Sequence, residues 1–94
     1  MDKMNLRLNT TDLDMYDDTK LDYVKYKIGQ NLRNFRIEMG ISVDDFCCKA
    51  NISKGYLYKI EAGEAKIGLT TLLKAEYILG VSHKDLIPEI EPSK

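Results

Sequence analysis

The stretch that decides the fold is Ile41–Gly63, ISVDDFCCKANISKGYLYKIEAG. It predicts a helix, a tight turn and a second helix. Ser42, followed three residues later by Asp45, has the spacing of a capping box, so the first helix is expected over 43–50. Asn51 falls at the corner between the two helices, where a left-handed backbone is needed and Asn tolerates it.

The second helix of this stretch is expected over 54–62, with Ser53 as its cap and Gly63 as its stop. Its outer face combines basic and aromatic side chains: Lys54, Tyr56, Tyr58 and Lys59. Two short helices with a basic, aromatic second helix suit the placement of a rigid rod in a DNA major groove.

A longer helix precedes this pair, from near Asp22 to Met39, and Gly40 ends it. One apolar stripe at helical spacing supports it: Val24, Ile28, Leu32, Phe35 and Met39.

Two more helices are predicted after the pair. The first covers about 69–79, and its apolar set is Leu69, Leu72, Leu73, Ala75 and Ile78. A short last helix follows the Ser82/Asp85 capping box and ends before Pro88. The sequence therefore predicts an all-α, five-helix domain over 23–88. An acidic leader over 1–22, which we expect to be flexible, precedes it, and a tail over 89–94 follows it.

The charge is distributed unevenly although the net charge is only −1. Residues 1–22 carry three basic and six acidic side chains, 3 − 6 = −3, whereas residues 23–87 carry ten basic and seven acidic ones, 10 − 7 = +3. A mildly basic domain behind an acidic leader is compatible with nucleic-acid binding.

Other classes of function lack support in the sequence. No apolar run is long enough for a membrane span, and the N-terminus lacks the apolar core of a secretory signal. Cys47 and Cys48 are adjacent, so a reducing, cytoplasmic setting fits, and packing of Cys47 is favoured over a redox or metal role. The sole histidine, His83, belongs to no catalytic or zinc pattern. We therefore expect neither an enzyme nor a metal or cofactor site.

Residues 28–87, about 60 of the 94, resemble the Cro/repressor-type helix-turn-helix domain, also called the xenobiotic-response-element family. The resemblance lies in an ordered set of short motifs: IGQNLRNFR, MGIS, ANIS, LYKIEAG, LTTLLKAEYILGVS and DLI. It implies a five-helix globule whose third helix reads DNA, usually as a homodimer on a palindromic operator.

The resemblance also implies which residues contact DNA. Base reading maps onto Lys54, Gly55 and Lys59, and the full expected set is Ser42, Val43, Ser53, Lys54, Gly55, Tyr56, Tyr58, Lys59 and Lys66. Lysine can donate to guanine O6 and N7, and tyrosine hydroxyls can reach phosphates. Arg36 and Glu61 match a pair that forms an internal salt bridge in many members. A carboxylate at a helix C-terminus opposes the helix dipole, which makes sense if a specific cation holds it.

Three positions depart from the family pattern. Val43 stands where most members carry a Gln that touches phosphate, Gly55 replaces a base-reading side chain, and the loop Glu64–Ile67 keeps a single cation, Lys66. Two hypotheses follow. The first is a sequence-specific DNA-binding transcriptional regulator. The second is a protein-interaction module on a helix-turn-helix scaffold that has lost most DNA contact. Dimer contacts are expected from Ile87 and Ile90, or from the leader.

Overall fold

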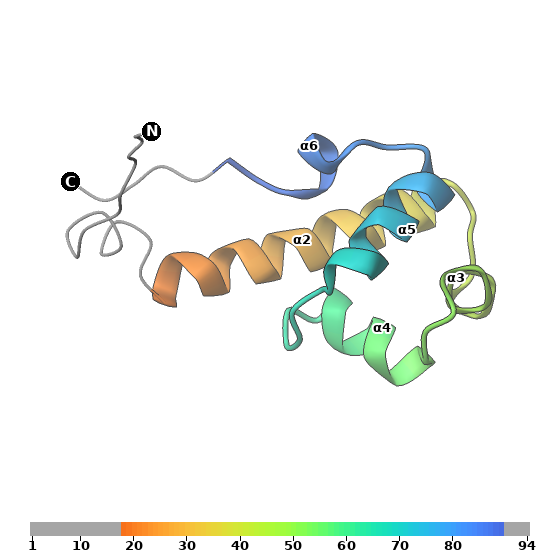
Figure 1. The fold of residues 1–94 in the computed structure, drawn as a ribbon, viewed down its shortest axis with the longest axis horizontal. Coiled ribbons are helices and arrows are strands. Elements are labelled where there is room, and N and C mark those ends of the chain that lie inside the picture. The colour runs from red at the N-terminus through yellow and green to blue at the C-terminus, as the bar shows by residue number, and fades with distance from the viewer. Residues whose placement is uncertain (1–17, 90–94) are drawn as a thin grey trace, which may run out of the picture.

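Five helices make up the part of the chain that the structure, a computed structural model, describes, residues 18–89 (Figure 1). They are α2 (Asp18–Glu38), α3 (Val43–Ala50), α4 (Lys54–Glu61), α5 (Leu69–Leu79) and α6 (His83–Leu86). Residues 18–89 contain no strand, and the prediction of an all-α, five-helix fold is confirmed. Most of the predicted leader, and the possible dimer contact Ile90, lie outside the described residues.

The first described helix is longer than the sequence predicted. It begins at Asp18, four residues before Asp22, so residues 18–22 belong to α2 and not to the leader. The segment contains no Gly or Pro that would stop a helix. Nothing in this local sequence therefore prevents the helix from starting before Asp22.

The turn between α3 and α4 has the geometry that its residues predict. The Ser42 hydroxyl accepts a hydrogen bond from the Asp45 N–H at 3.0 Å, which caps α3. Asn51 adopts a left-handed backbone with φ 57°, and its N–H bonds to the last carbonyls of α3. Ser53 then caps α4 by accepting from the Tyr56 N–H at 3.0 Å. Both short helices are therefore fixed at their ends by local hydrogen bonds.

The core lies where the five helices meet. Its largest fully buried side chains come from all five helices: Leu32, Phe46, Leu57, Ile60, Leu79 and Leu86. Around it, α2 packs chiefly against α4, and α3 packs against α5 and α4. In Figure 1 the long helix α2 extends beyond the other helices at its N-terminal end.

Three side chains that the sequence assigned to apolar helix faces are instead exposed. Met39 is 51% exposed after the end of α2, and Leu69 and Leu73 are 71% and 55% exposed. The helix α5 turns Thr71, Ala75 and Leu79 into the core, and residues two positions away point roughly 200° around the helix. Leu69, Leu73 and the 89% exposed Tyr77 therefore form a stripe on the outer face of α5.

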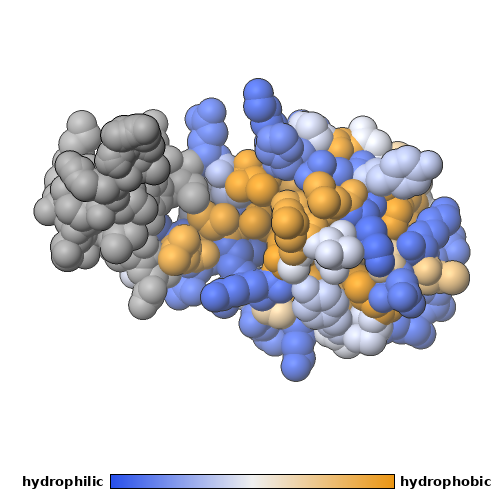
Figure 2. All heavy atoms as spheres, in the orientation of Figure 1, coloured by the Kyte–Doolittle hydropathy of each residue, from blue (hydrophilic) through white to orange (hydrophobic). Residues whose placement is uncertain are grey.

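The surface carries both apolar and hydrophilic residues. Figure 2 shows an apolar patch that begins beside the start of α2 and extends to the centre of this face, with hydrophilic residues around it. None of the helices in residues 18–89 has the length and apolar character that crossing a membrane requires.

Candidate nucleic-acid interface

The helix α4 has one buried and one exposed face. Leu57, Ile60 and Glu61 are buried against the core. Lys54, Gly55, Tyr58 and Lys59 are exposed, and a Cβ built on Gly55 would meet no atom within 4 Å. The exposed face therefore carries two ammonium groups and one phenol, with an open gap at Gly55.

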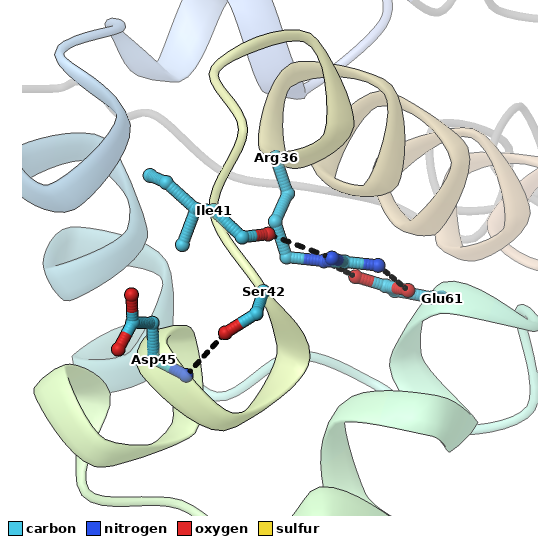
Figure 3. Close-up of polar contacts among 5 residues, drawn as sticks. All are labelled: Arg36, Ile41, Ser42, Asp45 and Glu61. Atoms are coloured by element: carbon cyan, nitrogen blue, oxygen red, sulfur yellow. Dashed lines mark hydrogen bonds and ion pairs between the residues drawn. The ribbon is translucent and has the colours of Figure 1, made fainter.

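A buried ion pair fixes α4 to the end of α2 (Figure 3). The Arg36 Nε donates to Glu61 Oε2 at 2.8 Å, and Nη2 donates to Oε1 at 3.2 Å. A third guanidinium nitrogen, Nη1, donates to the carbonyl of Ile41 at 2.9 Å. Arg36 is 7% exposed and Glu61 9%, and the hydrogen bond to Glu61 raises the pKa of Arg36 above its usual value. The bidentate geometry thus links α2, the loop before α3, and the C-terminus of α4.

Lys54 forms an ion pair with a carboxylate of the preceding helix. Its Nζ lies 2.8 Å from Oδ1 of Asp44, in the first turn of α3. Both side chains are more than half exposed. The hydrogen bond to Asp44 raises the pKa of Lys54 above its usual value. The first cation of α4 is therefore oriented, and partly neutralised, by the preceding helix.

Tyr56 uses its hydroxyl inside the protein. The hydroxyl donates to the carbonyl of Lys66 at 3.2 Å and accepts from the N–H of Gly68 at 3.0 Å. These two bonds tie the loop between α4 and α5 to the start of α4. Tyr56 is thus placed to position Lys66, which is exposed, and its hydroxyl is already engaged with the backbone.

The residues before α3 and α4 have mainly local roles. Ser42 and Ser53 are exposed, and both hydroxyls cap helices. Val43 is half-buried and packs against the core cluster, which gives it an apolar contact in place of a polar one. The serine hydroxyls lie beside the helix N-termini, where backbone N–H groups also suit a phosphate.

The cysteines differ in environment. Cys47 is buried in the core and burial raises its pKa, whereas Cys48 is exposed, and neither forms a disulfide. A buried thiol with a raised pKa is a poor nucleophile. Among residues 18–89, no group of three His, Cys, Asp or Glu side chains is arranged to hold a metal ion.

Sequence reasoning missed three contacts that shape this interface. Gly29 of α2 is buried, and a Cβ there would collide with the carbonyl oxygen of Ile60, so only glycine lets α2 and α4 pack this closely. Lys74 of α5 donates to the carbonyl of Ala50 at 3.0 Å, at the end of α3. Asp44 is the third. Of the three contacts, only that of Gly29 has a signal in the sequence, because an isolated glycine inside a helical pattern often has a packing reason.

The fold and the exposed, capped helix α4 define a helix-turn-helix protein. The chain belongs to the HTH_3 helix-turn-helix family, whose model matches residues 32–86, and this confirms the Cro/repressor-type resemblance. The family consists of non-enzymatic, DNA-binding transcriptional regulators.

Solved structures agree with the family assignment. The restriction-modification controller protein C.AhdI from Aeromonas hydrophila is 26% identical with a TM-score of 0.62, covering 66% of this chain and 94% of that chain. The N-terminal DNA-binding domain of SinR from Bacillus subtilis is 32% identical with a TM-score of 0.61, covering 68% and 96%. SinR in complex with DNA is 34% identical with a TM-score of 0.58, covering 63% and 97%. No curated protein sequence matches the chain.

Proposed function

We propose that this protein is a sequence-specific transcriptional regulator that places α4 in the major groove of DNA. The observation that carries the proposal is the exposed face of α4, on which Lys54 and Lys59 project from a helix that Ser53 caps and Arg36 anchors through Glu61. A rigid, basic helix of this kind suits direct reading of base edges. We expect such a regulator to act in the cytoplasm and to need no cofactor.

The remaining expected contacts divide by chemistry. Lys54 and Lys59 are proposed to meet base edges, with Tyr58 beside them, and Gly55 leaves room for the groove wall. Lys66 and the helix N-termini at Ser42 and Ser53 are proposed to meet phosphates. The likeness to SinR, whose structure in complex with DNA is known, supports this arrangement.

We further propose that the protein acts as a homodimer on a palindromic operator. Two copies would then place their α4 helices roughly 34 Å apart. Of the contacts expected from the sequence, Ile87 is half-buried at the end of α6. Light scattering with and without DNA tests the assembly. A monomer under both conditions that binds one isolated half-site contradicts the dimer.

The experiment that tests DNA reading compares two lysines. A preferred site is first selected from a random DNA pool. Replacing Lys59 by Ala should then cost about 1–3 kcal/mol on that site and flatten the preference at one base pair, because base edges differ between sequences. Replacing Lys66 by Ala should weaken all sequences similarly and reduce the salt slope by about 1 per bound chain, because phosphates do not differ.

The matched control is Lys84→Ala. Lys84 is an exposed lysine of α6, a helix that packs against α2 and α5. Lys84 is not among the residues proposed to contact DNA, so its loss removes the same charge and the affinity for DNA should stay as in the parent. If Lys59→Ala and Lys66→Ala also bind like the parent, α4 is not in the groove.

A second candidate function is a protein-interaction module, and one observation favours it. The stripe of Leu69, Leu73 and Tyr77 on α5 presents apolar surface outside the core. An exposed apolar stripe of this kind is typical of a contact surface. A protein-interaction module would bind no DNA even at low salt. A DNA-binding regulator should bind non-specific DNA at low salt in a mobility-shift assay, and this binding should disappear as the salt concentration rises.

A further inference from the structure

An apolar groove of about 290 Å³ lies between the N-terminal half of α2 and the loop that follows α4. Leu21, Val24 and Ile28 form one wall, on one face of α2. Ala65 and Ile67 of the loop form the other wall. Figure 1 shows this loop below the middle of α2, and Leu21, in the first turn of α2, also lines the groove. The groove is therefore close to the point where the preceding chain enters the domain.

Two lysines line the groove, and no lining residue is acidic. Lys25 comes from α2 and Lys66 from the loop. The nearest carboxylate described for Lys25 is Asp22, at 3.8 Å and 75% exposed, which is a weak contact. An occupant that combines apolar side chains with negative charge would therefore suit both the apolar walls of the groove and its two lysines.

The sequence just before α2 has this composition. Residues 12–16 read Asp-Leu-Asp-Met-Tyr, so acidic and apolar side chains alternate at 12–15. In an extended chain, Leu13 and Met15 point to one side and the two aspartates to the other. The apolar side can face the groove while Asp12 and Asp14 stay near the lysines and water.

We propose that residues 12–16 of the same chain dock in this groove. The reach is sufficient: from Asp18 to Ile28 the helix rises about 15 Å, and the five residues from Asp18 back to Leu13 span up to about 17 Å when extended. Tethering favours this occupant over a separate molecule, because a short linker gives an effective concentration in the millimolar range.

Docking has a consequence for DNA, which rests on the proposed function. Lys66 is the proposed phosphate contact, so an acidic segment beside it competes with DNA for the same ammonium group. If the segment is docked about 80–90% of the time and DNA binds only the undocked state, releasing the segment should raise the affinity for DNA about five- to tenfold. The leader would thus lower DNA binding until something displaces it.

The direct test is nuclear magnetic resonance on the full chain with labelled methyl groups, without DNA. We expect nuclear Overhauser effects from the Leu13 and Met15 methyls to those of Val24, Ile28 and Ile67. Replacing Leu13 and Met15 together by Ser should remove these effects and shift the groove methyl signals.

The matched control replaces Leu6 and Leu8, the other alternating pair before α2, by Ser. Their neighbours Asn5, Arg7 and Asn9 are not acidic, so the groove signals should not move. Absence of the effects, or an equal response to both double variants, overturns the proposal. A mixture of labelled and unlabelled chains that gives the effects only between molecules also overturns it, and assigns the groove to a second copy.

The DNA consequence is measured on the same variants. The Leu13/Met15 variant should bind the selected site about five- to tenfold more tightly than the parent, and the Leu6/Leu8 variant should bind like the parent. If no variant binds DNA, the proposed function fails while the magnetic resonance result still decides the docking. If docking is seen but the affinity does not change, the inhibitory role is wrong.

Discussion

Replacing Glu61 by Leu should leave the Arg36 guanidinium buried without its carboxylate partner. Leucine has a similar volume, so the substitution removes the carboxylate and leaves little empty space. Arg36 is 7% exposed and would keep only one protein acceptor, the carbonyl of Ile41 at 2.9 Å. Removing one partner of a buried ion pair typically costs about 3–5 kcal/mol, because the other charge is left uncompensated.

That cost is large for this domain. A domain of this size is stable by roughly 4–10 kcal/mol, so the single variant should lose about half of the free energy of unfolding. The double variant Arg36→Met with Glu61→Leu removes both charges and should lie within about 1 kcal/mol of the parent or above it. The ion pair would then orient α4 against α2 more than it stabilises the fold.

Urea unfolding followed by far-ultraviolet circular dichroism measures all three proteins. The matched surface control is Glu64→Leu, which changes an exposed carboxylate and should shift stability by no more than about 0.5 kcal/mol. If the free energy of unfolding of Glu61→Leu lies within about 1 kcal/mol of the parent's, an unpaired Arg36 does not destabilise the protein, and the reasoning is refuted. A double variant as unstable as the single one would refute it too, because the loss would then come from packing.

Four further outcomes are expected. Gly55→Ala should stabilise the protein by about 0.5–1 kcal/mol in the same urea assay, since the site is helical and open, and a loss of stability would show a hidden contact. Tyr56→Phe should cost about 1 kcal/mol of stability and weaken DNA binding at all sequences, and no change in the salt slope would show that Lys66 needs no positioning. One thiol per folded chain, Cys48, should react with a thiol reagent at pH 8 and two after unfolding. Because burial raises the pKa of Cys47, its contribution to stability should be full below about pH 8.5 and fall above it, as the unfolded thiol ionises first.

Local structure was predictable where a single residue decides it. Ser42 and Ser53 cap helices through bonds to an N–H three residues later, and Asn51 takes the left-handed conformation at the corner. The interactions span a few residues, so the sequence contains all of the information. Gly40, with φ 71°, ends the preceding helix for the same reason.

The buried face of α5 was not predictable in the same way. The helix LTTLLKAEYIL has apolar residues on more than one side, so its pattern permits several faces. Packing against α3 selects Thr71, Ala75 and Leu79, and leaves Leu69 and Leu73 outside. Such a choice depends on neighbours that are distant in sequence, and spacing within one helix cannot settle it.

In the site too, local sequence predicts some features and contacts between distant residues decide others. One such contact determines which lysine should dominate base recognition. The sequence identifies Lys54 and Lys59 as equivalent cations on one face, but only the fold brings Asp44 to 2.8 Å from Lys54. A base edge must compete with that carboxylate for the Lys54 ammonium. Lys59 forms no ion pair with any residue in 18–89, so its donors face no such competition. Removing Lys59 should therefore reduce the preference for the selected DNA site more than removing Lys54 does. In an Asp44→Asn background, the losses caused by the two substitutions should become more similar.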